Sequence, residues 1–382
     1  MDITSSAEKK KITVISDMRY LIALSMIKGI GPILARNLIA YLGAAEAVFT
    51  ETQQNLEKIP GIGGVLSQAI IGKTDLLKSA DNELEFIAKN GFNAFAYTDK
   101  TYPFRLKECS DAPVVLYTNG NIDLNKGRFV AVVGTRNITD YGRNVCETLI
   151  EDLVLQIPDV IIVSGLAYGA DITAHKSALK HNTPTVGVVA HGLDRLYPAA
   201  HTSIASKMTA SGAIVTEYTT NTEPDKPNFV QRNRIIAGMC DAIVVVESAI
   251  RGGSLLTADA ANLYNREVFA IPGRVGDTRS AGCNDLIRQN KAALIESASD
   301  LIKAMSWQPN ESKNSKQTLL FNDLSEEEQT IISVLRQHES LQINQLTLKL
   351  KLPVEKLFPL LIELEFKGHL RCLPGNVYKV VG

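Results

Sequence analysis

Glycine, hydroxyl and arginine residues gather in short segments that follow apolar runs of this chain. Glycine lets backbone N–H groups approach an anion, and the start of a helix attracts negative charge. Arginine adds paired hydrogen bonds to a phosphate or a carboxylate. One such loop would be an ordinary turn, but four loops, two of them with arginine, predict anion binding. The residues concerned are Gly134, Thr135, Arg136, Ser164, Gly165, Gly169, Arg251, Gly252, Gly253 and Ser254.

A further helix is predicted to begin near Arg232, Asn233 and Arg234. Positive charge at the start of a helix opposes the helix dipole, so these arginines need a negative partner. Glu217 and Glu247, both at predicted strand ends, are candidate internal partners. A phosphate of a ligand would serve equally well. The sequence leaves both alternatives open.

Enzymatic interpretations find weaker support in the same segments. Ser164, Asp171 and His175 share one loop and helix, and Asp171 and His175 are one helical turn apart. A catalytic triad needs a base that reaches the nucleophile and an acid that orients the base, which this spacing makes awkward. The sequence has no Gly-x-Ser-x-Gly elbow, no Walker A motif, and no Gly-x-Gly-x-x-Gly after the first predicted strand. We therefore expect His175 to be a packed, hydrogen-bonded helix residue.

The elements that must position these segments are six apolar runs and the helical patterns between them. The runs are at 129–133, 160–164, 185–190, 213–217, 242–247 and 267–271. The helical patterns are at 141–155, 171–181, 202–211, 231–239 and 254–265. Buried strands that alternate with helices predict an α/β fold with a doubly wound parallel sheet. Ligands of such sheets bind beyond the carboxyl ends of the strands, where the glycine and arginine segments fall.

The composition limits how the protein can bind a partner. The 382 residues are 45% hydrophobic, and 40 Lys and Arg against 41 Asp and Glu give a net charge of −1. This balance excludes an indiscriminate polybasic nucleic-acid binder but not a local basic surface. Five scattered cysteines without a Cys-x-x-Cys pair argue against a zinc site and against disulfides. We see no signal peptide or membrane span, so we expect a cytoplasmic protein without a membrane partner.

Two flanking segments differ in pattern from the middle of the chain. Residues 18–80 contain two helix, Gly-x-Gly, helix patterns, at 27–39 and 59–71, which resemble helix-hairpin-helix motifs. Such hairpins bind DNA phosphates or serve as plain turns, and the sequence leaves both roles open. Residues 323–382 resemble a winged helix, with three helical patterns and a small hairpin. Seven Lys and Arg against eight Asp and Glu at 321–382 favour protein contact or a structural role there.

The middle of the chain resembles a known family over residues 82–305. The ordered motifs are Gly-Thr-Arg at 134–136, Ser-Gly-x-Ala-x-Gly-x-Asp-x-x-Ala-His at 164–175, Gly-Leu-Asp-x-x-Tyr-Pro at 192–198, Arg-Asn-Arg-Ile-Ile-Ala-Gly at 232–238, Gly-Ser-Leu-x-Thr-Ala at 253–258 and Val-Phe-Ala-x-Pro-Gly at 268–273. In order and spacing they are similar to the DNA processing protein A family (DprA, also called Smf). The resemblance implies an extended Rossmann-like domain that binds single-stranded DNA in natural transformation. It further implies protection of incoming strands, loading of the RecA recombinase, homodimers, no enzymatic activity and no cofactor.

The resemblance assigns contact with DNA phosphate to Arg136. It also places the family's remaining motifs at Ser164, Gly165, Gly169, Arg232, Asn233, Arg234, Gly253 and Ser254. Tyr197 and Phe229 are the nearest aromatic candidates for base stacking, with core packing as the alternative. The chain departs from the family pattern at Ala199, where a lysine is frequent, and at His201, where asparagine is frequent. A DNA-contacting lysine is therefore lost or moved, and Lys207 is a distant substitute.

These observations predict five segments. They are an N-terminal tail (1–17), an all-α helix-hairpin-helix or SAM-like domain (18–80), an extended Rossmann-like DNA-binding domain (81–305), a linker (306–322) and a winged-helix domain (323–382). The favoured hypothesis is a non-enzymatic single-stranded-DNA binder, with double-stranded DNA as a further partner of the N-terminal domain. The alternative is a Rossmann-like nucleotide-processing enzyme of the hydrolase or phosphoribohydrolase type. Such enzymes usually carry a Pro-Gly-Gly-x-Gly-Thr loop, which Arg251 and the residues after it do not match.

Overall fold

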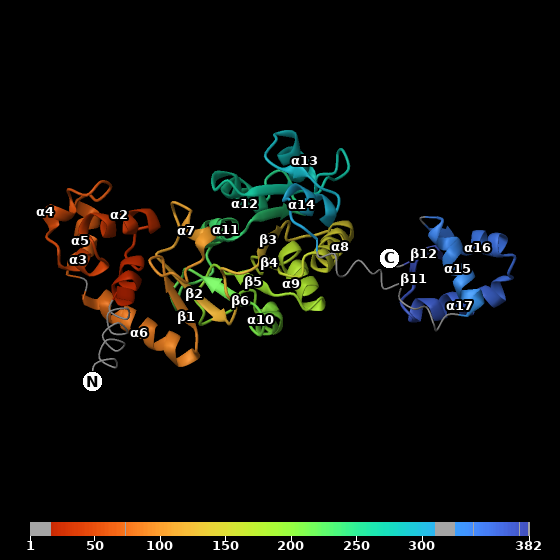
Figure 1. Ribbon diagram of the computed structural model, residues 1–382, viewed down its shortest axis with the longest axis horizontal. Coiled ribbons are helices and arrows are strands. Elements are labelled where there is room, and N and C mark those ends of the chain that lie inside the picture. Colours follow the sequence, from red (N-terminus) through yellow and green to blue (C-terminus); the bar gives the residue numbers. More distant parts are fainter. Residues whose placement is uncertain (1–16, 73, 310–324, 339, 374, 381–382) are drawn as a thin grey trace. The chain divides into compact units, whose positions relative to one another are not determined.

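The computed structural model describes residues 17–72, 74–309, 325–338, 340–373 and 375–380. The chain divides into two compact units, Met1–Glu311 and Ser312–Gly382 (Figure 1). The predicted tail up to residue 16 and the predicted linker from residue 310 onward lie outside the described residues.

A nine-stranded sheet forms the centre of the larger unit in the part of the chain that the structure describes. Its strands lie in the order β1-β2-β6-β5-β4-β3-β7-β8-β9. The seven strands β6-β5-β4-β3-β7-β8-β9 are parallel to their neighbours, which confirms the doubly wound sheet. At one edge, β2 pairs antiparallel with both β6 and β1. The strands are β1 (Asn93–Ala96), β2 (Val115–Gly120), β3 (Arg128–Val133), β4 (Val160–Ser164), β5 (Thr185–Val188), β6 (Ala213–Thr216), β7 (Ala242–Val245), β8 (Glu267–Ala270) and β9 (Ala293–Leu294).

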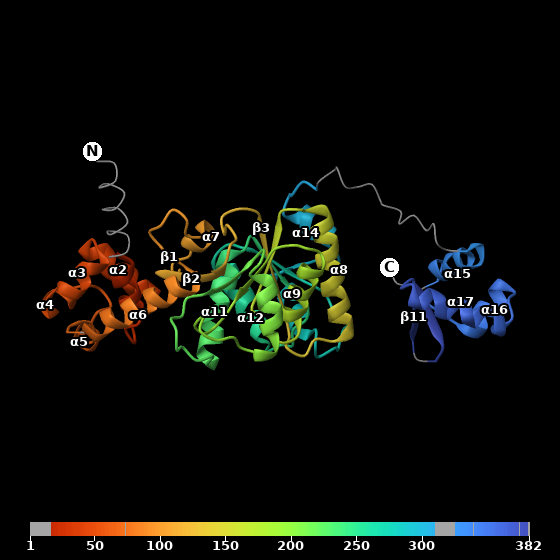
Figure 2. The same cartoon turned by 90° about the horizontal axis from the view of Figure 1, so that it is seen from below.

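Helices cover both faces of this sheet (Figure 2). Side chains alternate along a strand, so Phe129 and Ala131 of β3 enter one apolar core while Val130 and Val132 enter the other. The first core takes in α7 (Phe104–Lys107), α11 (Lys226–Met239), α12 (Gly253–Leu263) and α13 (Ala281–Arg288). The second takes in α8 (Asp140–Gln156), α9 (Ala170–Lys180) and α14 (Ala298–Ala304), and α10 (Thr202–Met208) packs beside α9.

The N-terminal helices share a third apolar core with the antiparallel edge of the sheet. Ala96, Val115 and Tyr117 of β1 and β2 pack among residues of these helices. The predicted domain boundary at 80/81 falls within one of them, α6, so the domain limits remain a prediction. The helices are at 17–25 and at α2 (Pro32–Leu42), α3 (Ala45–Thr50), α4 (Gln53–Leu56), α5 (Gly64–Ile70) and α6 (Thr74–Asn90).

The smaller unit is a winged helix, as predicted. Its apolar core joins buried leucines of α17 to residues of α15 and α16 and to Tyr378. A three-stranded antiparallel sheet, in the order β10-β12-β11, forms the wing. The elements are α15 (Glu326–Arg336), β10 (Leu341–Gln342), α16 (Ile343–Leu350), α17 (Val354–Phe366), β11 (Leu370–Leu373) and β12 (Val377–Val380). Among all described residues, no helix has both the length and the apolar character to cross a membrane.

Candidate functional site

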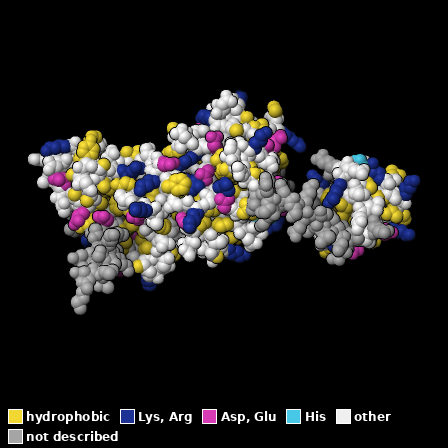
Figure 3. All heavy atoms as spheres, in the orientation of Figure 1, with side chains coloured by type: hydrophobic (Ala, Val, Ile, Leu, Met, Phe, Trp, Pro, Cys, Tyr) yellow, Lys and Arg dark blue, Asp and Glu magenta, His cyan; other side chains and the backbone are white. Residues whose placement is uncertain are grey.

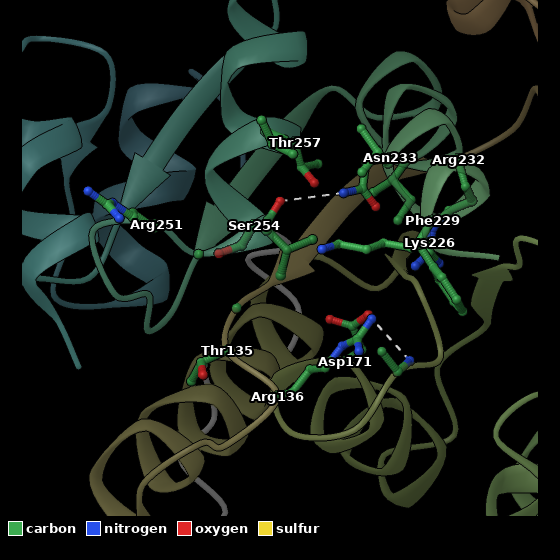
Figure 4. Close-up of a pocket in the computed structure, with 18 of the residues that line it drawn as sticks. Thr135, Arg136, Asp171, Lys226, Phe229, Arg232, Asn233, Arg251, Ser254 and Thr257 are labelled. Atoms are coloured by element: carbon green, nitrogen blue, oxygen red, sulfur yellow. Dashed lines mark hydrogen bonds between the residues drawn. The ribbon is translucent and has the colours of Figure 1, made fainter. Parts of the chain in front are cut away.

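A pocket of about 660 Å³ opens at the carboxyl edge of the sheet, beside the adjacent strands β3 and β7. The chain leaves β3 toward β4 on one side and leaves β7 toward β8 on the other, which is where an open α/β sheet forms a binding crevice. The loops after both strands, the start of α9 and the first turns of α11 supply its walls (Figure 4). The predicted site residues that line it are Gly134, Thr135, Arg136, Phe229, Arg232, Asn233, Arg251, Gly252, Gly253 and Ser254.

Close packing holds the loop that carries Arg136. A Cβ at Gly134 would lie 2.7 Å from the Cβ of Ala170 and 3.0 Å from the Glu247 carbonyl oxygen, so only glycine is accommodated there. The N–H of Thr135 donates to the Glu247 carbonyl at 2.7 Å. The Glu247 carboxylate accepts hydrogen bonds from the N–H of Thr139 at 2.9 Å and from its hydroxyl at 3.1 Å. Because Thr139 is the N-cap of α8, the loop is fixed at both ends and presents Arg136 in one place.

Three exposed cations line the pocket, namely Arg136, Lys226 and Arg251. None of the three forms an ion pair with a carboxylate in the described part of the chain. The guanidinium carbon of Arg136 lies 5.5 Å from the ring centroid of Phe229, and the Tyr197 ring lies 5.8 Å from the same centroid. Figure 4 shows Lys226 extending across the pocket toward the α12 loop, while Arg251 lies apart from the other two. Arg136, Lys226 and Phe229 therefore form a cationic and aromatic surface that is open to a ligand.

Arg232 contributes to the wall of the pocket from a buried position. Its guanidinium donates to the Gly165 carbonyl at 2.7 Å and to the Val188 carbonyl. The carboxylate of Asp171 accepts from the N–H groups of Gly165 at 3.1 Å and Ala167 at 3.4 Å. Burial lowers the pKa of Arg232 to about 10, and burial raises the pKa of Asp171 while Arg232 opposes that shift. Arg232 and Asp171 thus hold the loop between β4 and α9.

Arg234 is turned toward the N-terminal side of the unit and does not line the pocket. It forms an ion pair with Glu217 and donates to the Asp111 carbonyl at 2.7 Å. Burial raises the pKa of Glu217, and the charge of Arg234 acts against this shift. The structure therefore favours internal partners over a phosphate for both Arg232 and Arg234. Glu217 is such a partner, whereas Glu247 is engaged with the loop after β3.

Several predicted site residues lie beside the pocket and not in its lining. Ser164 is buried and its hydroxyl donates to the Val132 carbonyl at 2.6 Å. Gly165 faces the guanidinium described above, and Gly169 has a φ of +77°, which favours glycine. These three residues therefore support the conformation of the loop between β4 and α9. Tyr197, in contrast, is exposed at the rim of the pocket, beside the ring of Phe229.

His175 forms its hydrogen bond with Thr185 and with neither Ser164 nor Asp171, so these three residues form no triad. The Thr185 hydroxyl donates to the Ile162 carbonyl at 2.8 Å and accepts from Nδ1 of His175 at 2.7 Å. Burial lowers the pKa of His175 to about 3, so this histidine is neutral near neutral pH. The expectation of a packed, hydrogen-bonded His175 is confirmed. Among the described residues, no group of three His, Cys, Asp or Glu side chains could hold a metal ion.

Lys226 was not predicted from the sequence. The predicted helix began at 231, whereas α11 begins at Lys226, so the lysine lay outside the segment that the motif marked. The available signal was a lysine directly before Pro227 and three residues before Phe229, because proline is frequent in the first turn of a helix. Lys207, the substitute considered for a lysine at position 199, lies on α10 and is not in the pocket lining.

A doubly wound sheet with a cationic, glycine-rich pocket at the point where its strand order reverses defines a class of proteins that bind phosphate-containing ligands. Comparison with known proteins identifies the family. Residues 93–306 match the model of the DNA recombination-mediator protein A family, and residues 318–376 match the DprA winged helix domain. The first match covers more than half of the chain, and this protein belongs to the DNA recombination-mediator protein A family.

Relatives and solved structures agree with this assignment. Protein Smf of Synechocystis is 33% identical over 312 residues, which is 81% of this chain and 77% of the relative. DNA processing protein DprA of Streptococcus pneumoniae is 40% identical over 211 residues, 55% of this chain and 73% of that protein. The X-ray structure of DprA from S. pneumoniae matches with a TM-score of 0.62 at 33% identity, over 74% of this chain and 95% of that one. A structure describing the single-stranded-DNA binding mode of DNA processing protein A from Helicobacter pylori matches with a TM-score of 0.51 at 27% identity, over 56% and 95% of the two chains.

Proposed function

We propose that this protein binds single-stranded DNA in DNA-mediated transformation, with strand phosphates held at the pocket beside β3 and β7. The observation that carries the proposal is the exposed pair Arg136 and Lys226 beside Phe229. Exposed cations without an internal carboxylate partner are ready to neutralise phosphates, and an adjacent aromatic ring can stack on a base. The single-stranded-DNA binding of the H. pylori relative supports the choice of ligand.

A polymer suits this arrangement better than a single small anion. The glycine loops after β3 and β7 and the first turn of α11 lie along one edge of the sheet, so successive phosphates can meet successive loops. Figure 3 shows Lys and Arg side chains spread singly among Asp and Glu over the visible face of the larger unit. Binding is therefore expected to depend on a few placed cations and not on bulk positive charge.

The larger role follows from the family. We propose that the protein protects incoming single strands and loads RecA on them, acting as a homodimer in the cytoplasm. Membership in a family described as recombination mediators supports this role. The winged helix has almost balanced charge, with seven Lys and Arg against eight Asp and Glu at 321–382, which favours contact with protein over contact with DNA.

We propose that the protein is not an enzyme. A nucleotide hydrolase or phosphoribohydrolase would need an acid free to act in the pocket, and the carboxylate of Asp171 is engaged by backbone N–H groups and Arg232. The pure protein should leave nucleoside monophosphates unchanged. Turnover of any of them at a rate that follows the protein through purification would establish the enzymatic alternative.

Contact of the N-terminal helices with double-stranded DNA remains a prediction. Gly29 and Gly61 of the two hairpins have φ values of +90° and +88°, as tight helical hairpins require. Arg36, however, donates to the carbonyls of Cys109 at 2.9 Å and Ser110 at 3.2 Å, so it supports the fold. We expect a duplex of the same length as an oligo-dT strand to bind more weakly, and a gel-shift comparison of the two measures this.

The test of the proposed function is binding of fluorescent oligo-dT by wild type, Arg136→Ala and Lys226→Ala. Both variants should bind more weakly and remain folded, because both side chains are exposed. Lys126→Ala is the matched control. Lys126 is an exposed cation with 85% of its side chain accessible, and it precedes β3 at the amino edge of the sheet, opposite the pocket. Equal affinity in all four proteins would overturn the site.

A further inference from the structure

Tyr168 is an exposed aromatic residue in the loop between β4 and α9, with half of its surface (50%) accessible. The preceding residue, Ala167, lines the pocket, and the following residue, Gly169, packs against the loop that carries Arg136. The N–H of Ala170 donates to the Thr135 carbonyl at 3.1 Å. The backbone around Tyr168 is therefore in direct contact with the loop that carries Arg136, the residue expected to bind a strand phosphate.

The ring of Tyr168 meets a second loop on its other side. It packs against the buried ring of His201 in a T-shaped pair, with centroids 4.8 Å apart and planes at 67°. His201 ends the short 3₁₀ helix Ala199–His201, which begins two residues after Tyr197. Since β3, β4 and β5 are neighbours, Tyr168 stands between the loops that carry Arg136 and Tyr197.

The loop that holds Tyr168 is fixed by hydrogen bonds of its own backbone. The Gly165 carbonyl accepts from Arg232, and the N–H groups of Gly165 and Ala167 donate to Asp171. Nδ1–H of His201 donates to the Leu166 carbonyl at 2.8 Å, since a carbonyl can only accept. An exposed ring on such a loop needs no ordering when a ligand binds, which favours its use in binding.

Apart from the ring contact with His201, no internal partner of the Tyr168 side chain is found among the residues that the structure describes. Its hydroxyl makes no hydrogen bond to any residue that the structure describes. The contact with His201 can cover at most one face of the ring, because the two planes are steeply inclined, and half of the residue's surface is accessible. An open aromatic face beside a phosphate-binding loop is a platform on which a base can stack.

We infer that Tyr168 is a second base-stacking residue, and that the single strand continues from the pocket over the loops after β3, β4 and β5. This inference rests on the proposed function and extends its site beyond the pocket. Phe229 and Tyr197 are 5.8 Å apart and belong to the pocket rim, whereas Tyr168 would hold a base that lies outside the pocket. Neighbouring strands are about 4.8 Å apart, so the loops after β3 and β5 are roughly 10 Å apart at their bases, which is room for an additional stacked base. Stacking of this kind is tolerant of sequence.

The experiment compares short and long oligo-dT in fluorescence titrations. Strands of about 4 and about 16 nucleotides bracket the common site sizes of single-strand binders. Tyr168→Ala should bind the long strand about tenfold more weakly than wild type, and the short strand within about twofold. Tyr168→Phe should keep wild-type affinity for both, because the ring is retained and the hydroxyl is not used. Tyr41→Ala is the matched control, since Tyr41 is an exposed tyrosine of α2 (63% accessible) in the N-terminal helices.

The outcomes separate this inference from the proposed function. If wild type binds neither strand, the proposed function fails. If wild type binds and Arg136→Ala does not, while Tyr168→Ala matches wild type at both lengths, the stacking role of Tyr168 is wrong and the pocket site stands. Photocrosslinking of wild type to an oligo-dT strand carrying 5-iodouracil tests the same contact without any variant, so misfolding of a variant cannot affect the result. A crosslinked peptide containing Tyr168 is expected, and crosslinks at Phe229 alone would overturn the inference.

Discussion

Two pairs of cations in the larger unit have opposite environments. Arg232 and Arg234 are directed inward, where backbone carbonyls accept their hydrogen bonds, Glu217 forms an ion pair with Arg234, and the charge of Asp171 acts on Arg232. Arg136 and Lys226 are exposed at the pocket. The inward pair belongs to the most conspicuous motif in the sequence, whereas Lys226 belongs to none of the motifs. The comparison teaches that a motif arginine can build the scaffold of a binding site while an inconspicuous lysine faces the ligand.

This difference separates stability from binding. Substituting a buried arginine leaves buried carbonyls without a donor and a buried carboxylate without a nearby positive charge, so the folded state is destabilised. An exposed cation that is removed leaves the folded state nearly unchanged, and only the attraction for phosphate is lost. Stability and affinity for oligo-dT should therefore respond to different substitutions.

The largest expected effect is on stability. Arg232→Met should lower the free energy of unfolding by about 3–5 kcal/mol, because it leaves the Gly165 and Val188 carbonyls without their donor and removes the charge that favours the buried Asp171 carboxylate. Urea denaturation followed by circular dichroism measures this, with Lys126→Met as the control for losing an exposed cation. If Arg232→Met unfolds within about 0.5 kcal/mol of wild type, as exposed substitutions do, Arg232 is not part of the scaffold.

The next effect is on binding. Arg136→Ala should weaken binding of oligo-dT by about 10- to 100-fold, the range expected for loss of a charge-assisted hydrogen bond. Its free energy of unfolding should stay within about 0.5 kcal/mol of wild type. Fluorescence anisotropy and urea denaturation of the same preparation give both numbers. If Arg136→Ala is destabilised but binds oligo-dT normally, Arg136 supports the fold and does not hold the strand.

A smaller effect concerns pH and the buried side of the unit. Burial lowers the pKa of His175 from its ordinary value of 6.5 to about 3, so the unfolded chain binds a proton that the folded chain excludes. Excluding this proton costs the folded state little above pH 6.5, where the histidine of the unfolded chain is also mostly neutral. Below pH 6.5 the protein therefore loses stability progressively, until the pH reaches about 3. Between pH 7 and pH 5 this exclusion should cost the folded state about 2 kcal/mol. Urea titrations of wild type and His175→Gln at both values measure it, and an equal pH dependence in the two proteins would contradict the assignment.

The sequence predicted the centre of the fold well because that centre is continuously apolar. Runs such as 160–164 are buried on both faces of a parallel sheet, and a continuous run of β-branched residues predicts such a strand. The antiparallel edge was missed because Asn93–Ala96 is four residues long and partly exposed, so it carries no clear period. Its partner β2 contains a short buried apolar run, but its place at the edge follows from contacts with the N-terminal helices, which the run itself does not predict.

The pocket was predicted in outline, while the roles of its charged residues were not. Glycine loops at strand ends lead directly to the carboxyl edge of the sheet, so Gly134 and Gly253 could be placed. The burial of Arg232 could not be predicted, because the carbonyls that accept from it belong to Gly165, directly after β4, and to Val188 of β5, far along the chain. Predicting Lys226 as a site residue required the exact start of α11, and helix ends are the least certain feature of a sequence pattern.

The most direct test of the central claim is the salt dependence of oligo-dT binding. Each phosphate contact on a single strand contributes about 0.7 to the slope of log K against log salt concentration. The double variant Arg136→Ala/Lys226→Ala should therefore reduce the magnitude of the slope by about 1.4 relative to wild type, and Lys126→Ala should leave it unchanged. A double variant with the wild-type slope would show that these two cations do not hold the strand.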